Sequence, residues 1–279
     1  MLTLASDLHF PEGPRWHEGA LYFSDFYRHS VFRMAANGEL ECVAKVAEQP
    51  SGLGWLPDGR MLIVSMLNRR VLRQERDGKI ELHADLNAYA AWHCNDMIVD
   101  RSGRAYIGNF GFDSHGGAEP KGADLIAVEP DGKARVVASD LMFPNGTVIT
   151  PDGRTLIIGE TRANRLTAFT IDSAGGLSER REWASLGIYF PDGICLDADG
   201  CIWVADPRNS CVLRVAQGGR IERKIDLSLG AFACTLGGVD GRTLYVCAAK
   251  GSGDVARAER SGCILAMDVD VPACVPASP

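Results

Sequence analysis

Three short segments of the 279-residue sequence share one pattern, in which a polar residue follows Phe-Pro and precedes glycine. They read FPEG, FPNG and FPDG, and their polar residues are Glu12, Asn145 and Asp192. A fourth segment, CND, carries Asn95 ahead of a similar apolar run. Carboxylates and carboxamides are hard oxygen donors, the ligands that Ca²⁺, Mg²⁺ and Mn²⁺ prefer. If the fold brings these four side chains together, they predict a site for one divalent cation.

A simpler interpretation is that these residues only make turns, because Asn-Gly and Asp-Gly are common turn sequences. Glu12 is a poor turn residue, however, and Asn95 is followed by Asp96 and Met97 rather than by glycine. The choice depends on whether the four residues occupy equivalent positions in a larger pattern.

A repeat runs along the whole chain. A tight turn ending in glycine and followed by a hydrophobic strand occurs six times, at intervals of 40 to 50 residues, with the glycines at Gly19, Gly59, Gly103, Gly153, Gly200 and Gly241. Each unit continues with a third strand, a second glycine turn and a fourth strand. Such hairpins at this period are typical of propeller blades. The sequence therefore predicts an all-β fold, a six-bladed β-propeller with four antiparallel strands per blade, forming a single domain over residues 1–279.

The repeat also defines six equivalent positions, which are reached by counting back seven or eight residues from each turn glycine: Glu12, Ser51, Asn95, Asn145, Asp192 and Cys234. The first strand of a blade borders the central channel, so these side chains are expected to form a ring at one mouth of the channel. Without a cation, Glu12 and Asp192 would repel each other there.

The two ends of the chain are expected to meet. The segment TLASDLHFPEG at 3–13 is similar to VVASDLMFPNG at 136–146. Residues 2–8 therefore correspond to the fourth strand of a blade, but the first three strands of that blade do not precede them. This N-terminal strand is expected to close the last blade. Residues 272–279 are expected to form a loose C-terminal tail.

Composition excludes several partners. The net charge is −7 and no basic run occurs, so neither nucleic acid nor an anionic membrane surface is expected to bind. The sequence shows neither a signal peptide nor an apolar stretch long enough to span a membrane, which predicts a cytoplasmic protein, a monomer or small homo-oligomer. The nine cysteines lack metal-site spacing and are expected to be reduced.

The motifs resemble those of the senescence marker protein, gluconolactonase and luciferin-regenerating enzyme family, which includes regucalcin. The match rests on FPEGPRW, CNDMIVDRSGRAYIGN, FPNGTVITPDGRTLIIGET and FPDGICLDADGCIWVAD, and the repeat extends it over essentially the whole chain. The resemblance implies one catalytic divalent metal held by Glu12, Asn145 and Asp192. The residue matching Asn95 contacts substrate in sugar lactonases and is a direct metal ligand in related phosphotriesterases of squid type. Ca²⁺ is the expected ion, with Mg²⁺, Mn²⁺, Zn²⁺ or Fe²⁺ as alternatives.

One departure from the family concerns the substrate. Sugar lactonases of the family often have an arginine two residues before the residue matching Asn95, where this sequence has His93. That argues against a gluconolactone-like substrate, and Phe110 and Phe112, in the loop at 109–124, favour a less polar one. Substrate contacts are expected from Asn95, His93, Asp96 and Phe110. The remaining polar residues of the loop are expected to be solvated: Asp113, His115 and Glu119.

The predicted reaction is hydrolysis of a small-molecule lactone, with Asp192 as the general base. Two alternatives stay open, a phosphotriesterase or fluorophosphatase, and a non-enzymatic calcium-binding regulator. The acids that end the second strands, Asp25, Glu160 and Asp206, are expected to cap turns. Residues 253–260 are expected to form a solvated loop.

Overall fold

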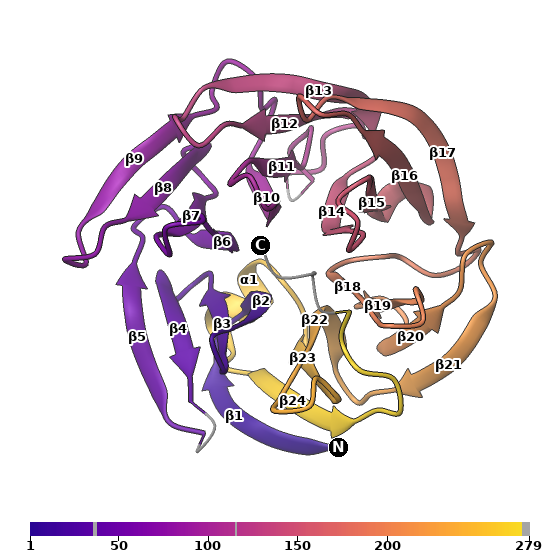
Figure 1. The fold of residues 1–279 in the computed structure, drawn as a ribbon. Coiled ribbons are helices and arrows are strands. Elements are labelled where there is room, and N and C mark those ends of the chain that lie inside the picture. Colours follow the sequence, from indigo (N-terminus) through magenta and orange to yellow (C-terminus); the bar gives the residue numbers. More distant parts are fainter. Residues whose placement is uncertain (36–37, 115, 275–279) are drawn as a thin grey trace.

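The computed structural model describes residues 1–35, 38–114 and 116–274. In these ranges, six four-stranded antiparallel sheets surround a central axis (Figure 1). The predicted six-bladed β-propeller is confirmed. In each blade the first of the four strands named below is the innermost, and the fourth lies at the rim (Figure 1).

The first three blades follow one another along the chain. Blade one contains β2 (Pro11–His17), β3 (Ala20–Asp25), β4 (Ser30–Met34) and β5 (Leu40–Lys45). Blade two contains β6 (Pro50–Trp55), β7 (Met61–Ser65), β8 (Arg70–Gln74) and β9 (Ile80–Asp85). Blade three contains β10 (Cys94–Val99), β11 (Ala105–Asn109), β12 (Ala123–Val128) and β13 (Ala134–Leu141).

The remaining blades include the only departures from strand and turn in the described residues. Blade four contains β14 (Pro144–Ile149), β15 (Thr155–Glu160), the 3-10 turn η1 (Thr161–Ala163), β16 (Arg165–Ile171) and β17 (Leu177–Ser185). Blade five contains β18 (Ile194–Leu196), β19 (Ile202–Asp206), β20 (Cys211–Val215) and β21 (Ile221–Asp226). Blade six contains β22 (Gly230–Gly237), β23 (Thr243–Ala249), the helix α1 (Asp254–Ala258), β24 (Gly262–Asp268) and β1 (Leu2–Leu8).

The N-terminal strand closes the ring as predicted. β1 pairs antiparallel with β24, with Leu2 opposite Ala266 and Leu8 opposite Gly262. Blade six is thus built from both ends of the chain, and β24 is not left as an open edge.

Turn chemistry and apolar packing explain why this sequence makes blades. At the first hairpin of blade two, Gly59 has a φ of +86° and its N–H donates to the carbonyl of Leu56 at 2.9 Å. Glycine adopts that conformation without steric cost. The cores lie between neighbouring blades: Leu62 and Val64 of blade two pack in one buried cluster with Ile107 of blade three. The inner strands are therefore fixed from both sides.

Two expectations about loops were wrong. The tail is not loose at 272–274, because Ala273 bridges to Asp197 and donates its N–H to the carbonyl of Gly241 at 2.8 Å. Residues 275–279 of that predicted tail lie outside the described residues. The segment at 253–260 contains helix α1, whose Ala256 is buried. No helix in the described part of the chain has the length and apolar character to cross a bilayer.

Candidate functional site

The predicted ligand residues meet at one mouth of the central channel. A cavity of about 380 Å³ is lined there by Glu12 of β2, Asn95 of β10, Asn145 of β14 and Asp192, two residues before β18. Each is at or near the first residue of an innermost strand, so the repeat places them around the same axis (Figure 1). His93 and Phe110 also line this cavity, which we call the ligand cavity.

Burial and mutual repulsion perturb both carboxyl groups. The pKa of Glu12 is raised well above its ordinary value, first by burial and then by the charge of Asp192. The pKa of Asp192 is also raised, by burial and by the charges of Asp96 and Asp206. A cation between two such carboxylates would relieve this repulsion.

Backbone and side-chain hydrogen bonds hold the polar groups in place. Glu12 Oε2 accepts the N–H of Gly13 at 2.6 Å. The Thr161 hydroxyl donates to the carbonyl of Pro191 at 2.6 Å and accepts from Asn145 Nδ2 at 3.3 Å. Because the Asn145 amide nitrogen is used in this way and also in a hydrogen bond to Asp192, its oxygen is the atom left to act as a ligand.

The donor set fits a hard divalent cation. It consists of two carboxylates and two carboxamides, the oxygen ligands typical of Ca²⁺ and Mg²⁺ sites. Among the described residues no group of three or more His, Cys, Asp and Glu side chains is arranged to hold a metal. Any ion at this cavity would therefore depend on the amide oxygens of Asn95 and Asn145 as well as on Glu12 and Asp192.

A repeated buried carboxylate positions the backbone that leads to three of these residues. Asp25 Oδ1 accepts the N–H of Phe10 at 3.1 Å, two residues before Glu12. Glu160 Oε2 accepts the N–H of Met142 at 2.8 Å, three residues before Asn145. Asp25 and Glu160 are fully buried.

Asp206 is the third of these buried carboxylates. It is also fully buried, and its Oδ2 accepts the N–H of Phe190 at 3.0 Å, two residues before Asp192. Asp206 also caps its own turn by accepting the N–H of Arg208 at 2.9 Å. The predicted capping role is confirmed here, and the second role was missed. Its signal was present in the repeat, since an acid ended the second strand of the blades that supply Glu12, Asn145 and Asp192.

The sixth ring position was assigned wrongly. Blade six contributes Phe232, not Cys234, to the ligand cavity. Cys234 is buried, with its Sγ 3.6 Å from the carbonyl of Gly193 and 3.9 Å from Cys195 Sγ. β22 is eight residues long, the longest of the innermost strands, so counting back from Gly241 stops too late in the strand.

Ser51 and Asp96 lie near the site but do not line the ligand cavity. The Ser51 hydroxyl is 3.5 Å from Asn95 Oδ1. Asp96 Oδ1 instead accepts from the guanidinium of Arg15 at 2.7 Å and from the N–H of Met97 at 2.8 Å. The structure therefore does not bring Asp96 together with the other predicted substrate-binding residues.

Aromatic side chains form two walls of the ligand cavity. On one side Phe110 stacks on Phe143 at 4.5 Å, and His93 lies 6.1 Å from Phe110. On the other side Phe10 meets Phe232 edge to face at 4.6 Å. Phe10, Phe110 and Phe232 belong to one apolar cluster, which gives the cavity an aromatic lining beside its polar residues.

The loop at 109–124 contributes only in part. Phe110 and Asp113 line the cavity, Phe112 packs against Phe143 in a T-shaped contact at 6.0 Å, and Glu119 is exposed away from it. Asp113 was expected only to be solvated. The prediction for His115 falls outside the described residues.

Part of the segment that was expected to form a solvated loop also lines the cavity. Ser252, Gly253, Asp254 and Arg257 line it, and the Arg257 guanidinium lies 5.1 Å from the centre of the Tyr27 ring. The helix α1 is anchored where the carbonyl of Ala256 meets His9 Nδ1 at 3.1 Å. A five-residue helix is too short to leave a periodic signal in the sequence.

Comparison with known proteins agrees with this architecture. The family model described as the SMP-30/Gluconolactonase/LRE-like region matches residues 10–250. A 6-deoxy-6-sulfogluconolactonase of Pseudomonas putida is 27% identical over 277 residues, covering 94% of this chain and 92% of that protein. A pentonolactonase of Haloferax volcanii is 27% identical over 252 residues, covering 87% and 82%. The fold is similar to that of a calcium-binding protein, regucalcin, of Agrobacterium tumefaciens, with a TM-score of 0.81, 22% identity and coverage of 97% and 94%.

Proposed function

The chain belongs to the SMP-30/gluconolactonase/LRE-like family, and from this premise we propose that it hydrolyses a lactone with the help of one divalent cation, for which Ca²⁺ is the expected ion. The relatives named as a sulfogluconolactonase and a pentonolactonase support a lactone substrate. The observation that carries the proposal is that Glu12, Asn145 and Asp192, from three different blades, line one cavity.

Glu12, Asn145 and Asp192 are the proposed ligands, and Asn95 completes the set either as a fourth ligand or as a substrate contact. When bound, the cation polarises a carbonyl oxygen and lowers the pKa of water. The residues contribute pre-organised donors, because Glu12 is held by the N–H of Gly13 and Asn145 by Thr161. Donors fixed in advance need no reorganisation when charge develops on the substrate.

Asp192 is the proposed general base. Asp192 lines the cavity, and a hydrogen bond from the side chain of Asn145 orients its carboxylate. A base must lie within hydrogen-bond reach of the proton that it accepts. His93 and Phe110 are proposed to contact the body of the substrate, since both line the same cavity.

A second candidate reaction is hydrolysis of a phosphotriester. The observation that favours it is that Asn95 lines the cavity together with the other three residues, so that up to four side-chain oxygen donors could bind one ion. Such a site would polarise a phosphoryl oxygen by the same chemistry.

The deciding experiment removes metal with a chelator, restores Ca²⁺, Mg²⁺, Mn²⁺, Zn²⁺ or Fe²⁺ singly, and follows proton release from sugar lactones, aliphatic lactones and a paraoxon-like ester. Activity with a lactone that returns with one ion and is lost in Asp192→Asn supports the proposal. Faster turnover of the phosphotriester supports the second candidate. Metal binding without turnover of any substrate would favour the non-enzymatic calcium-binding alternative.

A further inference from the structure

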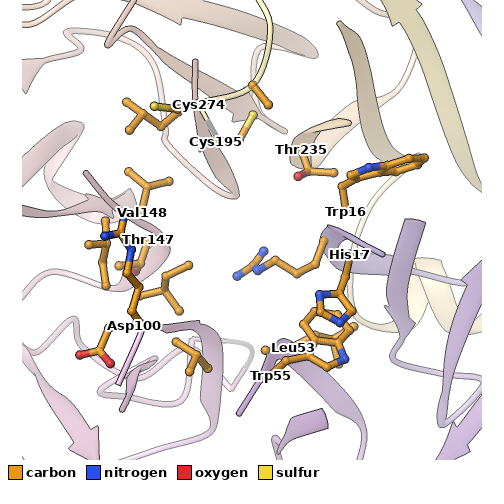
Figure 2. Close-up of a pocket in the computed structure, with 18 of the residues that line it drawn as sticks. Trp16, His17, Leu53, Trp55, Asp100, Thr147, Val148, Cys195, Thr235 and Cys274 are labelled. Atoms are coloured by element: carbon orange, nitrogen blue, oxygen red, sulfur yellow. The ribbon is translucent and has the colours of Figure 1, made fainter. Parts of the chain in front are cut away.

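The opposite mouth of the channel holds a second cavity, of about 540 Å³ (Figure 2). Its wall includes Trp16 and His17, at the far end of β2, and Trp55 of β6 (Figure 2). Arg15, three residues after Glu12 on the same strand, also lines it. β2 thus carries the carboxylate of Glu12 at one mouth of the channel and the guanidinium of Arg15 toward the other.

The Arg15 guanidinium is bound to acceptors inside the channel. Its Nη2 donates to Asp96 Oδ1 at 2.7 Å and to the carbonyl of Met97 at 2.5 Å, and its Nη1 donates to the carbonyl of Pro14 at 2.9 Å. The Arg15 and Asp96 side chains are only 17% and 8% exposed. Ion pairs this well buried are screened little by solvent.

Asp96 follows Asn95 directly in β10 and lines neither cavity. Its charge nevertheless raises the pKa of both Glu12 and Asp192, while Arg15 lowers that of Glu12. Without Arg15, one more uncompensated negative charge would lie beside Asn95.

We propose that Arg15 is a positioning residue that neutralises Asp96 and so lowers the negative charge beside the cation site. The inference rests on the proposed metal site. By holding Asp96 through a charged hydrogen bond, Arg15 also keeps this carboxylate directed away from the ligand cavity.

The test compares binding of Ca²⁺ and Tb³⁺, by calorimetry and by terbium luminescence, in the full-length protein. Replacing Arg15→Met leaves an extra negative charge, so the ratio of Tb³⁺ to Ca²⁺ affinity should rise about tenfold. Replacing Asp96→Asn removes one, so the ratio should fall about tenfold. The double variant should return close to the native ratio, and Arg15→Lys, which keeps the charge, should leave it nearly unchanged.

Arg214→Met is the matched control. Arg214 pairs with buried Asp197 at the same 2.7 Å and is 15% exposed, but lies away from the ligand cavity. It should lose stability without a change in the ratio. Opposite shifts in the two single variants cannot come from misfolding, and if Arg15→Met does not fold, Asp96→Asn alone tests the sign.

Equal ratios in all variants, or shifts in the same direction, would overturn the role of Arg15 while leaving the proposed function standing. A native protein that binds neither ion would overturn both.

Discussion

The carboxyl groups of Glu12 and Asp192 belong to the first and fifth blades, yet they face one cavity, where the charge of Asp192 adds to burial in raising the pKa of Glu12. Like charges held in a poorly solvated place disfavour the folded state unless a proton or a cation separates them.

Removing one member of the pair should stabilise the metal-free protein. Glu12→Gln is expected to raise the melting temperature in chelator at neutral pH and to abolish the increase that Ca²⁺ causes. In the native protein, Ca²⁺ at a hundred times its Kd should add about 2.7 kcal/mol to the free energy of unfolding. Calorimetry with and without Ca²⁺ measures both effects. Glu41→Gln, at an exposed position of β5, is the control, and a Glu12→Gln protein that Ca²⁺ still stabilises would count against the site.

The stability of the metal-free protein should depend on pH. A carboxyl group whose pKa is raised on folding binds its proton more tightly in the folded state. Its contribution is therefore complete below the unfolded pKa, about 4.3 for glutamate, and is lost as the pH rises through the folded value. The pKa values of Glu12 and Asp192 are both raised, so the melting temperature in chelator should fall as the pH rises above the ordinary carboxyl value of about 4.3. Saturating Ca²⁺ should flatten this profile, and a profile that stays the same in both conditions would contradict the pairing.

The contribution of the buried Glu160 carboxylate to stability should have the opposite pH dependence. Burial alone would raise the pKa of Glu160, but hydrogen bonds from Arg165, Met142 and Thr167 hold it below its ordinary value. A lowered carboxyl pKa contributes stability above the unfolded value that is lost as the pH falls through the folded one. Glu160→Gln should therefore cost about 1–3 kcal/mol at neutral pH, with a smaller difference from the native protein below about pH 4.

The same variant tests whether the hydrogen bond between Glu160 and the N–H of Met142 positions Asn145. Because Met142 loses a charged acceptor, Ca²⁺ affinity should fall several-fold as well. Glu179→Gln, on the exposed face of β17, should change neither property. An equal loss of stability at all pH values, with Ca²⁺ affinity intact, would show that Glu160 only stabilises its blade.

The aromatic wall should select the substrate. Phe110→Ala removes the ring that stacks on Phe143, so kcat/KM for a lactone with an apolar substituent should fall about 10- to 100-fold, as for other losses of apolar contact in a pocket. A small unsubstituted lactone should lose less. Steady-state kinetics on the two lactones measure the difference. Phe32→Ala, which removes an outward ring of blade one that stacks on Phe23, controls for general destabilisation, and equal losses on both lactones would contradict a selective wall.

The fold could be predicted because each blade repeats local signals. The Asx-Gly turns fix hairpins, and alternation of apolar residues fixes which faces are buried. The similarity of residues 3–13 to 136–146 was enough to place β1 on β24. The same repeat identified Glu12, Asn95, Asn145 and Asp192, since equivalent positions on innermost strands must face one axis.

The remaining parts of the site depend on contacts that a repeat does not record. Phe232 replaces Cys234 at the cavity because β22 is the longest of the innermost strands. Asp96 faces Arg15, a partner 81 residues away, and no local pattern reports such a pair. Arg257 reaches the cavity from a long connection between β23 and β24, and the only comparable connection between second and third strands in the described residues is the one between β11 and β12.

The pairing of β1 with β24 also constrains how the chain is made. β1 is synthesised first, but its hydrogen-bonding partner emerges only after the other five blades. Until β24 is synthesised, β1 has no strand to pair with and the ring of blades stays open. Contacts of such long sequence separation close slowly. The metal ligands of the first and fifth blades are therefore expected to be held at their final spacing only at the end of folding, so that cation binding would report a completed ring.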